Sequence, residues 1–433
     1  MTHVEKPALL IGAAGSGSGK TSIVAGLARS LARAGKKVAV FKIGPDFLDP
    51  FILQRAAGSP AVQVDLWMMG EEECRGLLYK GASEADYVLV EGSLGLFDGA
   101  PSAADFAKLF DLPIVNVINS KGTAETVHAI ALGLQGFRSD VNVVGYVVNN
   151  VASDRHQLMI ERSLTDNNDF LGVIRRDANA ALPSRHLGLQ QANEIPEIDK
   201  CLDALADLVE KTALTTAFRA RRFTPITSPT APSQPLLGKT IAIAQDEAFS
   251  FLYRHNLSFL QEHGAQLAFF SPVRDKVVPA CDAVYLPGGY PELHAEQLAA
   301  NASMRASIRD VHLSSVPIYA ECGGMMYLLQ SLQRSDGAKF RMCGVLDGTA
   351  TMTTRLQQLG YQMFEYEGRE MRGHTFHYSK AVVHASKRIS AVRTIDGKQG
   401  ESVIFAEKTV ASYIHAYFPS NPKFILDVLN GGM

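Results

Sequence analysis

The chain has 433 residues, of which 46% are hydrophobic and 20% charged, and its formal net charge is −2. This length predicts two or three domains, because a typical domain holds about 150 residues. The nearly neutral charge excludes an overall basic surface, so we expect no nucleic-acid partner. No apolar stretch approaches the ~18 residues of a membrane span, and the apolar run within 1–12 is too short for a signal peptide. We therefore expect a cytoplasmic protein with no membrane partner.

Short apolar runs alternate with helical patterns in the first half of the chain. The runs are nearly continuous and rich in Val and Ile, which is typical of strands in a parallel sheet that is buried on both faces. Helical patterns fill the segments 21–34 and 123–134 between some of these runs. The expected strands are 7–14, 36–44, 85–92, 112–119 and 141–150.

A glycine-rich turn joins the first expected strand to the first expected helix. Its sequence, AGSGSGKT at 14–21, fits a phosphate loop that begins with alanine instead of glycine. Small residues let backbone N–H groups wrap around phosphate oxygens at a helix N-terminus. Lys20 is expected to reach the β- and γ-phosphates, and the Thr21 hydroxyl to ligate Mg²⁺. The predicted nucleotide-binding residues are Gly15, Ser16, Gly17, Ser18, Gly19, Lys20 and Thr21.

Acidic residues stand at the ends of two expected strands. Asp46 follows the second strand, and Glu91 closes the third. Ligands of open parallel sheets bind at the carboxyl ends of the strands, so both residues are candidate Mg²⁺ ligands, with a solvated loop acid as the alternative. Asp49 precedes a proline and Asp98 a glycine, so a turn-forming role weighs equally with a ligand role for these two.

A proline-rich segment divides the chain. Residues 224–235 contain four prolines and no apolar periodicity, which predicts an extended, semi-rigid linker. We therefore place one domain at 1–223, a linker at 224–237 and a second domain at 238–433. Strand and helix patterns also alternate in the second half, so both domains belong to the α/β class. The expected elements there are strands at 239–246, 264–272, 282–289, 315–321 and 412–419 and helices at 252–263 and 325–332.

One of the five cysteines lies where a strand meets a helix. The cysteines have no CxxC spacing, so we expect free thiols and neither disulfides nor a zinc site. Cys322, in the segment AECGGM, would project from a tight turn above the sheet, as nucleophiles do in strand–turn–helix motifs. The helix N-terminus is expected to lower the thiol pKa. Candidate oxyanion donors are the N–H groups of Gly323 and of the pair Gly288 and Gly289, for which a plain glycine turn is the alternative.

A thiol nucleophile needs a base that accepts its proton and returns it. The sequence contains 12 histidines, and composition cannot select among them. His415, at the end of a late apolar segment, is one candidate, and His374 and His377 are its main rivals.

Seven further motifs follow the phosphate loop: KIGPDFLDP, EGSLGLFDG, PGGYPELH, AECGGMMYL, TTRLQQLGY, GHTFHYS and SYIHAYF. In these motifs and their order the chain resembles, over essentially its whole length, the cobyrinate and hydrogenobyrinate a,c-diamide synthases of cobalamin biosynthesis. The resemblance implies a dethiobiotin-synthetase-like ATP domain followed by a class I glutamine amidotransferase domain. It also implies that glutamine is hydrolysed through a cysteine thioester, that ATP phosphorylates a corrinoid carboxylate, and that ammonia displaces the phosphate at side chains c and a in turn.

The resemblance also implies a role for each candidate residue. Cys322 becomes the nucleophile and His415 its paired histidine. The other implied roles are oxyanion donors at Gly288 and Gly289, ATP and Mg²⁺ binding at Lys20 and Thr21, metal-binding acids at Asp46 and Glu91, and corrinoid carboxylate handling at Asp49 and Asp98.

Two positions depart from the patterns of related enzymes. Many class I amidotransferases carry a glutamate two residues after the histidine, where this chain has Tyr417. A Cys–His dyad is therefore expected, and the group that orients His415 is undefined. The family motif GHEFHYS reads GHTFHYS here, so Thr375 replaces an acid that would serve corrinoid or interdomain contacts.

Two other functions remain as alternatives. A diamide synthase for another tetrapyrrole, such as Ni-sirohydrochlorin, would use the same chemistry. A regulatory P-loop ATPase with a degenerate amidotransferase domain would have no need for Cys322 on a tight turn. The expected partners are a corrinoid or tetrapyrrole polycarboxylate, ATP and L-glutamine, and exposed sheet edges are compatible with a homodimer.

Overall fold

The computed structural model describes residues 3–164, 169–182, 197–226 and 233–432. The chain divides into two compact units, Met1–Ser228 and Pro229–Met433. The predicted linker, 224–237, lies partly outside the described residues, at 227–232. Its exact limits stay a prediction.

The first unit is built on an eight-stranded sheet with the order β3-β2-β4-β1-β5-β6-β7, in which β8 also pairs with β1. All neighbours are parallel except β8, which runs antiparallel to β1. The parallel sheet predicted for this half of the chain is confirmed. The elements are β1 (Val4–Ala13), α1 (Lys20–Arg33), β2 (Val38–Ile43), α2 (Asp49–Ala57), β3 (Ala61–Val64), α3 (Glu71–Glu84), β4 (Tyr87–Glu91), α4 (Ala103–Leu109), β5 (Ile114–Asn119), α5 (Thr126–Gly136), β6 (Val143–Val151), α6 (Asp154–Arg162), β7 (Phe170–Arg175), α7 (Ile198–Val209) and β8 (Arg219–Phe223), with short 3₁₀ turns at Ala178–Ala180 and Leu214–Ala217.

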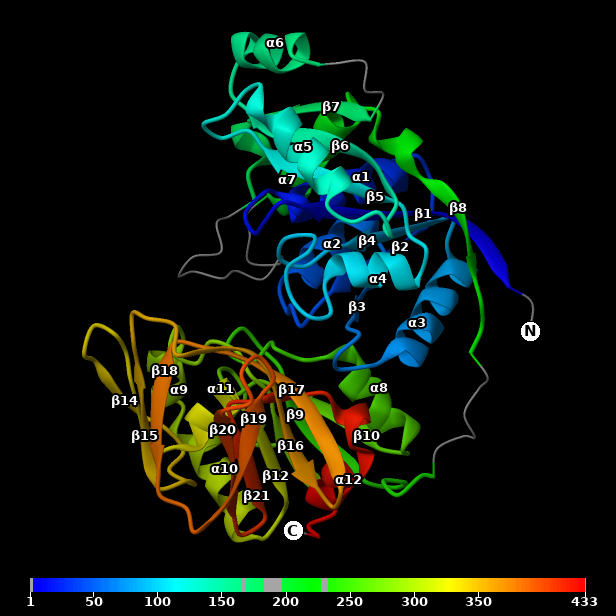
Figure 1. Cartoon of the computed structure of the whole chain (residues 1–433). Coiled ribbons are helices and arrows are strands. Elements are labelled where there is room, and N and C mark those ends of the chain that lie inside the picture. The colour runs from blue at the N-terminus through cyan, green and yellow to red at the C-terminus, as the bar shows by residue number, and fades with distance from the viewer. Residues whose placement is uncertain (1–2, 165–168, 183–196, 227–232, 433) are drawn as a thin grey trace. The chain divides into compact units, whose positions relative to one another are not determined.

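Helices cover both faces of this sheet (Figure 1). Successive residues of a strand point to opposite faces, so Ile11 packs with α1 and α7 while Leu10 packs with α3 and α4. Helix α1 approaches α7 closely at Gly26, where a Cβ would lie 2.8 Å from the Leu205 carbonyl oxygen. This packing holds the N-terminus of α1 at the carboxyl end of β1.

The second unit contains a ten-stranded sheet with the order β10-β9-β11-β12-β21-β20-β19-β16-β17-β22. Its strands are parallel from β10 to β21 and antiparallel from β21 to β22. A four-stranded sheet, β14-β13-β15-β18, accompanies it. The elements are β9 (Thr240–Ala244), α8 (Arg254–Glu262), β10 (Gln266–Phe270), β11 (Ala283–Leu286), α9 (Ala295–Ala300), α10 (Ala302–Leu313), β12 (Ile318–Glu321), α11 (Gly323–Leu328), β13 (Ser331–Gln333), β14 (Lys339–Arg341), β15 (Gly348–Met352), β16 (Gln358–Tyr366), β17 (Arg369–His377), β18 (Ser379–Val383), β19 (Lys387–Arg393), β20 (Gln399–Ala406), β21 (Thr409–Ser412), β22 (His415–Ala416) and α12 (Pro422–Leu429), with a 3₁₀ turn at Phe418–Ser420.

Two expected elements of the second half were wrong in extent. The strand expected at 412–419 is only the end of β21 followed by the two-residue β22, because the chain leaves β12 after Ser412 and pairs with β17 instead. The helix expected at 325–332 ends at Leu328, because the N–H of Gln330 donates to the Gly348 carbonyl and the chain enters the four-stranded sheet.

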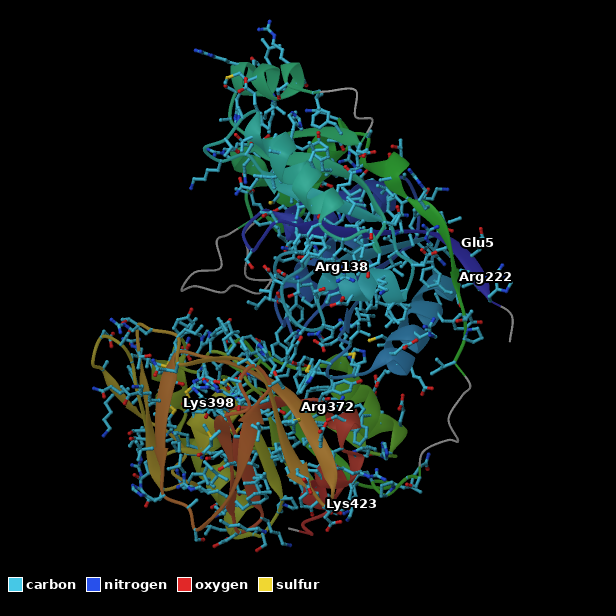
Figure 2. The ribbon with its side chains drawn as sticks, viewed as in Figure 1. Glu5, Arg138, Arg222, Arg372, Lys398 and Lys423 are labelled. Atoms are coloured by element: carbon cyan, nitrogen blue, oxygen red, sulfur yellow. The ribbon has the colours of Figure 1, made fainter. Side chains whose placement is uncertain are left out.

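Figure 2 labels charged side chains in both units, and some of them form ion pairs. Glu5 and Arg222 are register partners on β1 and β8. Arg138 forms ion pairs with Asp105 at 2.7 Å and with Asp140 at 2.8 Å. In the part of the chain that the structure describes, no helix is both long and apolar enough to cross a bilayer.

Candidate functional sites

The predicted phosphate loop connects β1 to α1. Gly17 and Gly19 have φ values of 75° and 95°, which favour glycine. A Cβ at Gly19 would lie 2.2 Å from Asn149 Nδ2, so this position also has no room for a side chain. The Ser18 hydroxyl donates to the Gly15 carbonyl at 2.9 Å and closes the turn.

The loop after β4 lies against the phosphate loop. Buried Lys20 donates from Nζ to the carbonyls of Gly15, at 3.2 Å, and Leu94. The N–H of Leu96 donates to the Ala13 carbonyl at 2.7 Å. These bonds place the segment EGSLGLFDG beside the amino group that is expected to meet the phosphates.

Four buried polar side chains meet where β1, β2 and β4 end. Thr21 Oγ1 lies 2.7 Å from Glu91 Oε1 and 3.3 Å from Asp49 Oδ2. Lys42 Nζ forms ion pairs with Glu91 Oε1 at 3.0 Å and Asp49 Oδ2 at 3.2 Å. Burial alone would lower the pKa of Lys42, but the carboxylates of Glu91, Asp49 and Asp46 outweigh burial and raise it. Lys42 is therefore an ammonium held between carboxylates.

The acids of the first unit make different contacts. Asp46 Oδ1 accepts the N–H groups of Leu48, at 2.9 Å, and Asp49, at 3.0 Å, and so caps the start of α2. Asp49 lies beside Thr21, the position that sequence reasoning expected for Asp46. Asp98 is exposed and accepts the N–H of Gly95 at 3.0 Å, a turn contact. Lys42 was not predicted, although a lysine inside the apolar run VAVFKI is a signal of a buried ion pair.

The acid cluster fits a magnesium ion bound together with phosphates. Among the described residues, Glu91 Oε2 is buried and accepts no hydrogen bond. Mg²⁺ in phosphate-binding sites uses one or two carboxylates and a hydroxyl, and the phosphates supply further oxygens. The described residues hold no group of three or more His, Cys, Asp or Glu with the geometry of an all-protein metal site. Thr21, Asp49 and Glu91 therefore suit a magnesium ion that is also bound by phosphate oxygens, and not one that is bound by protein side chains alone.

In the second unit, Cys322 occupies a strained turn between β12 and α11. Its φ is 44° and its ψ is −104°, values that non-glycine residues rarely adopt. Its N–H donates to the Ser412 carbonyl of β21 at 2.7 Å. A Cβ at Gly324 would lie 2.2 Å from the Leu286 carbonyl oxygen, so the turn packs directly on the end of β11. This is the strand–turn–helix setting expected for a nucleophile.

The pKa of Cys322 is raised, not lowered as the helix N-terminus had suggested. Burial raises it most, the carboxylate of Glu292 adds to the rise, and a hydrogen bond from the Gly323 N–H only partly opposes them. The following helix has six residues, so its dipole contributes little. Cys322 is therefore a protonated thiol at rest and needs a proton acceptor.

His415 is the buried imidazole nearest to the predicted oxyanion turn. A Cβ at Gly288 would lie 2.2 Å from its Cε1 atom, so only glycine fits beside the ring. The ring centroid of Phe251 lies 5.8 Å from that of His415. Burial, together with His374 and His377, lowers the pKa of His415 to about 3, so the imidazole is neutral at rest.

The three predicted oxyanion glycines come together. A Cβ at Gly323 would lie 3.0 Å from the Gly289 backbone nitrogen, so the turn of Gly288 and Gly289 touches the start of α11. The Gly288 carbonyl accepts the N–H of Phe251 at 3.0 Å, which fixes the turn. Their N–H groups are thus placed beside the Cys322 turn.

Both rival histidines lie on β17, next to His415. His377 has both ring nitrogens engaged, by the Ser379 carbonyl at 2.9 Å and by Glu401 at 3.1 Å, so it is poorly suited as a base. His374 is the register partner of His415. Thr375 lies between His374 and His377 on β17 and is buried. Its hydroxyl lies 3.0 Å from Gln362 Nε2, so the atypical threonine is accommodated inside this unit.

Comparisons with known proteins agree with the two units. Residues 9–189 match the family described as CobQ/CobB/MinD/ParA nucleotide binding domain, and residues 240–423 match the family described as CobB/CobQ-like glutamine amidotransferase domain. Hydrogenobyrinate a,c-diamide synthase of Pseudomonas aeruginosa is 46% identical, over 98% of this chain and 97% of its own length. The enzyme of the same name from Stutzerimonas stutzeri is also 46% identical, over 98% of both chains. Cobyrinate a,c-diamide synthase of Herminiimonas arsenicoxydans is 45% identical, over 96% of this chain and 94% of its own.

The relatives span nearly the whole chain, and the two matched domains coincide with the two sites. The chain is thus a glutamine-dependent ligase that joins a nucleotide-binding domain to an amidotransferase domain. It belongs to the family of cobyrinate and hydrogenobyrinate a,c-diamide synthases.

Proposed function

We propose that this chain amidates the a and c side-chain carboxylates of cobyrinate or hydrogenobyrinate, with ATP as the activating co-substrate and glutamine as the nitrogen donor. The observation that carries the proposal is that one chain holds both a phosphate loop with an acid cluster and a buried thiol with a neutral imidazole. Relatives that match nearly the whole chain bear the corresponding names.

In the second unit, the Cys322 sulfur adds to the carboxamide carbon of glutamine while His415 accepts the thiol proton. The N–H groups near Gly288, Gly289 and Gly323 would stabilise the oxyanion that forms. His415 returns the proton to the leaving nitrogen, the C–N bond breaks, and ammonia departs. Water then hydrolyses the thioester to give glutamate and restore the thiol.

In the first unit, a carboxylate oxygen of the corrinoid attacks the γ-phosphorus of ATP, and the bond to ADP breaks. Lys20 and the N–H groups of the phosphate loop hold the phosphates in line for this transfer. Thr21, Asp49 and Glu91 would hold Mg²⁺, which neutralises phosphate charge when bound. Ammonia then attacks the acyl carbon and expels phosphate, which leaves an amide. We propose that Asp98, exposed in the loop after β4, contacts the corrinoid.

The test is incubation of the protein with ATP, Mg²⁺ and glutamine, with the substrate read by mass spectrometry. Cobyrinate, hydrogenobyrinate and Ni-sirohydrochlorin are offered in parallel. Two successive losses of 1 Da from a corrinoid, each dependent on ATP, are expected because –OH is replaced by –NH₂. Conversion of Ni-sirohydrochlorin alone would replace the corrinoid assignment, and no ATP-dependent product from any of the three would overturn the proposal.

A further inference from the structure

The segment that carries His415 is held by a carboxylate from the strand that carries Cys322. Glu321, the last residue of β12, is 1% exposed. Its Oε1 accepts the N–H of Ala416 at 2.9 Å, the residue directly after His415. Its Oε2 accepts the hydroxyl of Tyr285 at 2.9 Å and lies 4.0 Å from His415 Nδ1.

The contact from Glu321 takes the place of a carboxylate that many class I amidotransferases carry two residues after the histidine. The residue two positions after His415 is Tyr417, which has no carboxylate. On the other side of the same segment, Asn256 of α8 donates to the Ala416 carbonyl at 2.8 Å and accepts the N–H of Phe418 at 2.9 Å. The backbone next to His415 is therefore fixed by Glu321 and Asn256, and Glu321 also brings a carboxylate oxygen to within 4.0 Å of the imidazole.

Glu321 also lies where charge develops during glutamine hydrolysis. Burial raises the pKa of Glu321 to about 8, against hydrogen bonds from Ala416, Tyr285 and Tyr319 that lower it. Burial likewise keeps His415 neutral at rest. When His415 accepts the Cys322 proton, an imidazolium forms 4 Å from this carboxyl group, and pairing of the two charges offsets the burial cost of each. At 4.0 Å the two groups are within ion-pair distance and are not hydrogen-bonded, and contacts of this kind often shorten only when substrate binds.

We propose that Glu321 is the positioning residue of the glutaminase site, which orients the His415 ring through Nδ1 and stabilises its imidazolium form. The inference rests on the proposed Cys322–His415 glutaminase. It makes the site a triad in which the carboxylate directly precedes the nucleophile in the chain. The groups that face Glu321 are Tyr285 from β11, Tyr319 from β12 and the segment of His415 from β22. His374 and His377 of β17 also act on the imidazole.

The test compares Glu321→Gln with Glu321→Asp in the full-length protein. The readout is the ratio of glutamine-dependent to ammonia-dependent amidation, so that any general loss of folded protein cancels. The variant Glu321→Gln keeps the size of the side chain and its contact with Ala416 but removes the charge. Its kcat with glutamine as substrate should fall about 10²- to 10⁴-fold. The KM for glutamine should stay within about threefold, because the interaction is made to the imidazolium and not to bound glutamine. The variant Glu321→Asp keeps a carboxylate, so its kcat should be higher than that of Glu321→Gln.

The pH profile separates positioning by charge from a purely structural role. A carboxyl whose pKa is raised to about 8 carries its charge only above that pH, so glutaminase activity of the unmutated protein should rise through about pH 8. Glu321→Gln should lack this rise. Tyr285→Phe removes a hydrogen bond that lowers the Glu321 pKa, so the rise should move to higher pH. Glu365→Gln, at an exposed position on β16, is the matched control and should leave the profile unchanged.

The possible failures are distinguishable. If Cys322→Ala keeps glutamine-dependent activity, the proposed glutaminase itself is wrong. If Cys322→Ala loses that activity while Glu321→Gln keeps a normal ratio and a normal pH profile, only the role of Glu321 is overturned.

Discussion

In both candidate sites the charge of the buried side chains depends on their surroundings, through burial in the second unit and through neighbouring carboxylates in the first. Cys322 and His415 are both neutral at rest, because burial raises the pKa of the thiol and lowers that of the imidazole. In the first unit the opposite holds: Lys42 stays charged because two buried carboxylates lie within 3.2 Å. Both residues of the proposed glutaminase site are therefore uncharged at rest, whereas the acid cluster of the first unit holds charges that suit phosphate and metal binding.

Replacement of Cys322 by alanine should abolish glutamine-dependent amidation and spare the ammonia-dependent reaction. The thiol is the only group at the turn that can form a thioester, so the glutamine-dependent rate should fall on the order of 10⁴-fold or more. Parallel assays with glutamine and with ammonium chloride measure both rates. Loss of both rates in a folded variant would contradict the assignment of separate sites.

Replacement of Asp49 by asparagine should impair amidation with either nitrogen source. Its carboxylate lies beside Thr21 and Lys42, so the loss weakens the site for phosphate activation, by about 10²-fold. Asp46→Asn is the matched control. An asparagine at this position keeps the side-chain oxygen that accepts the N–H groups of Leu48 and Asp49, so this variant should change stability and both rates little. A larger loss of activity in the Asp46 variant would return the metal-binding role to Asp46.

Each site is assembled from the ends of neighbouring strands. In the first unit β1, β2 and β4 deliver Thr21, Lys42 and Glu91 to one edge of the sheet. In the second unit β11 and β12 deliver the Gly288 turn and Cys322, and the segment after β21 delivers His415. Parallel neighbours end at the same edge, so residues far apart in sequence meet there.

A methyl group at Gly288 should disable the glutaminase by displacing the imidazole. The added Cβ would lie 2.2 Å from His415 Cε1, and a misplaced base costs about 10²-fold or more in rate. Ammonia-dependent amidation should be retained. Gly133→Ala, in α5 where a Cβ meets no atom within 4 Å, is the control and should leave both rates intact. Normal glutamine-dependent turnover by Gly288→Ala would show that the ring does not need this position.

At the scale of the whole molecule, the two proposed sites lie on one chain, one in each unit. The first unit holds the phosphate loop and the second holds the thiol and imidazole. The proposed reaction therefore requires ammonia made in one unit to be consumed in the other.

Mixing two single variants should test this division of work. Lys20→Ala should lose phosphate activation and keep glutamine hydrolysis, whereas Cys322→Ala should do the reverse. The mixture should make amide from glutamine at a rate well below that of the unmutated protein, because ammonia must pass through bulk solvent. An enzymatic ammonia scavenger should remove that residual rate. Amide formation by Lys20→Ala alone would contradict the phosphate-loop assignment.

Sequence patterns predicted a feature correctly where one contiguous segment contains all of its residues. The phosphate loop, the strand-to-helix turn at Cys322 and the five parallel strands expected in the first half are contiguous in sequence, and each was predicted correctly in kind. The antiparallel strands between 331 and 406 were not predicted. They are partly exposed, so their apolar pattern is weak even where neighbouring strands form hairpins, as β16 and β17 do.

The sequence by itself determined the α/β class, the phosphate loop and the family motifs, because these are properties of contiguous residues. Only the tertiary structure decided between residues that share a motif: Asp49 lies at Thr21 while Asp46 caps a helix, and Lys42 joins the acids from another strand. It also raised the pKa of Cys322, where a local argument from the helix N-terminus expected the opposite. The physical reason is that burial and the meeting of strand ends are set by the whole fold, and no single segment encodes them.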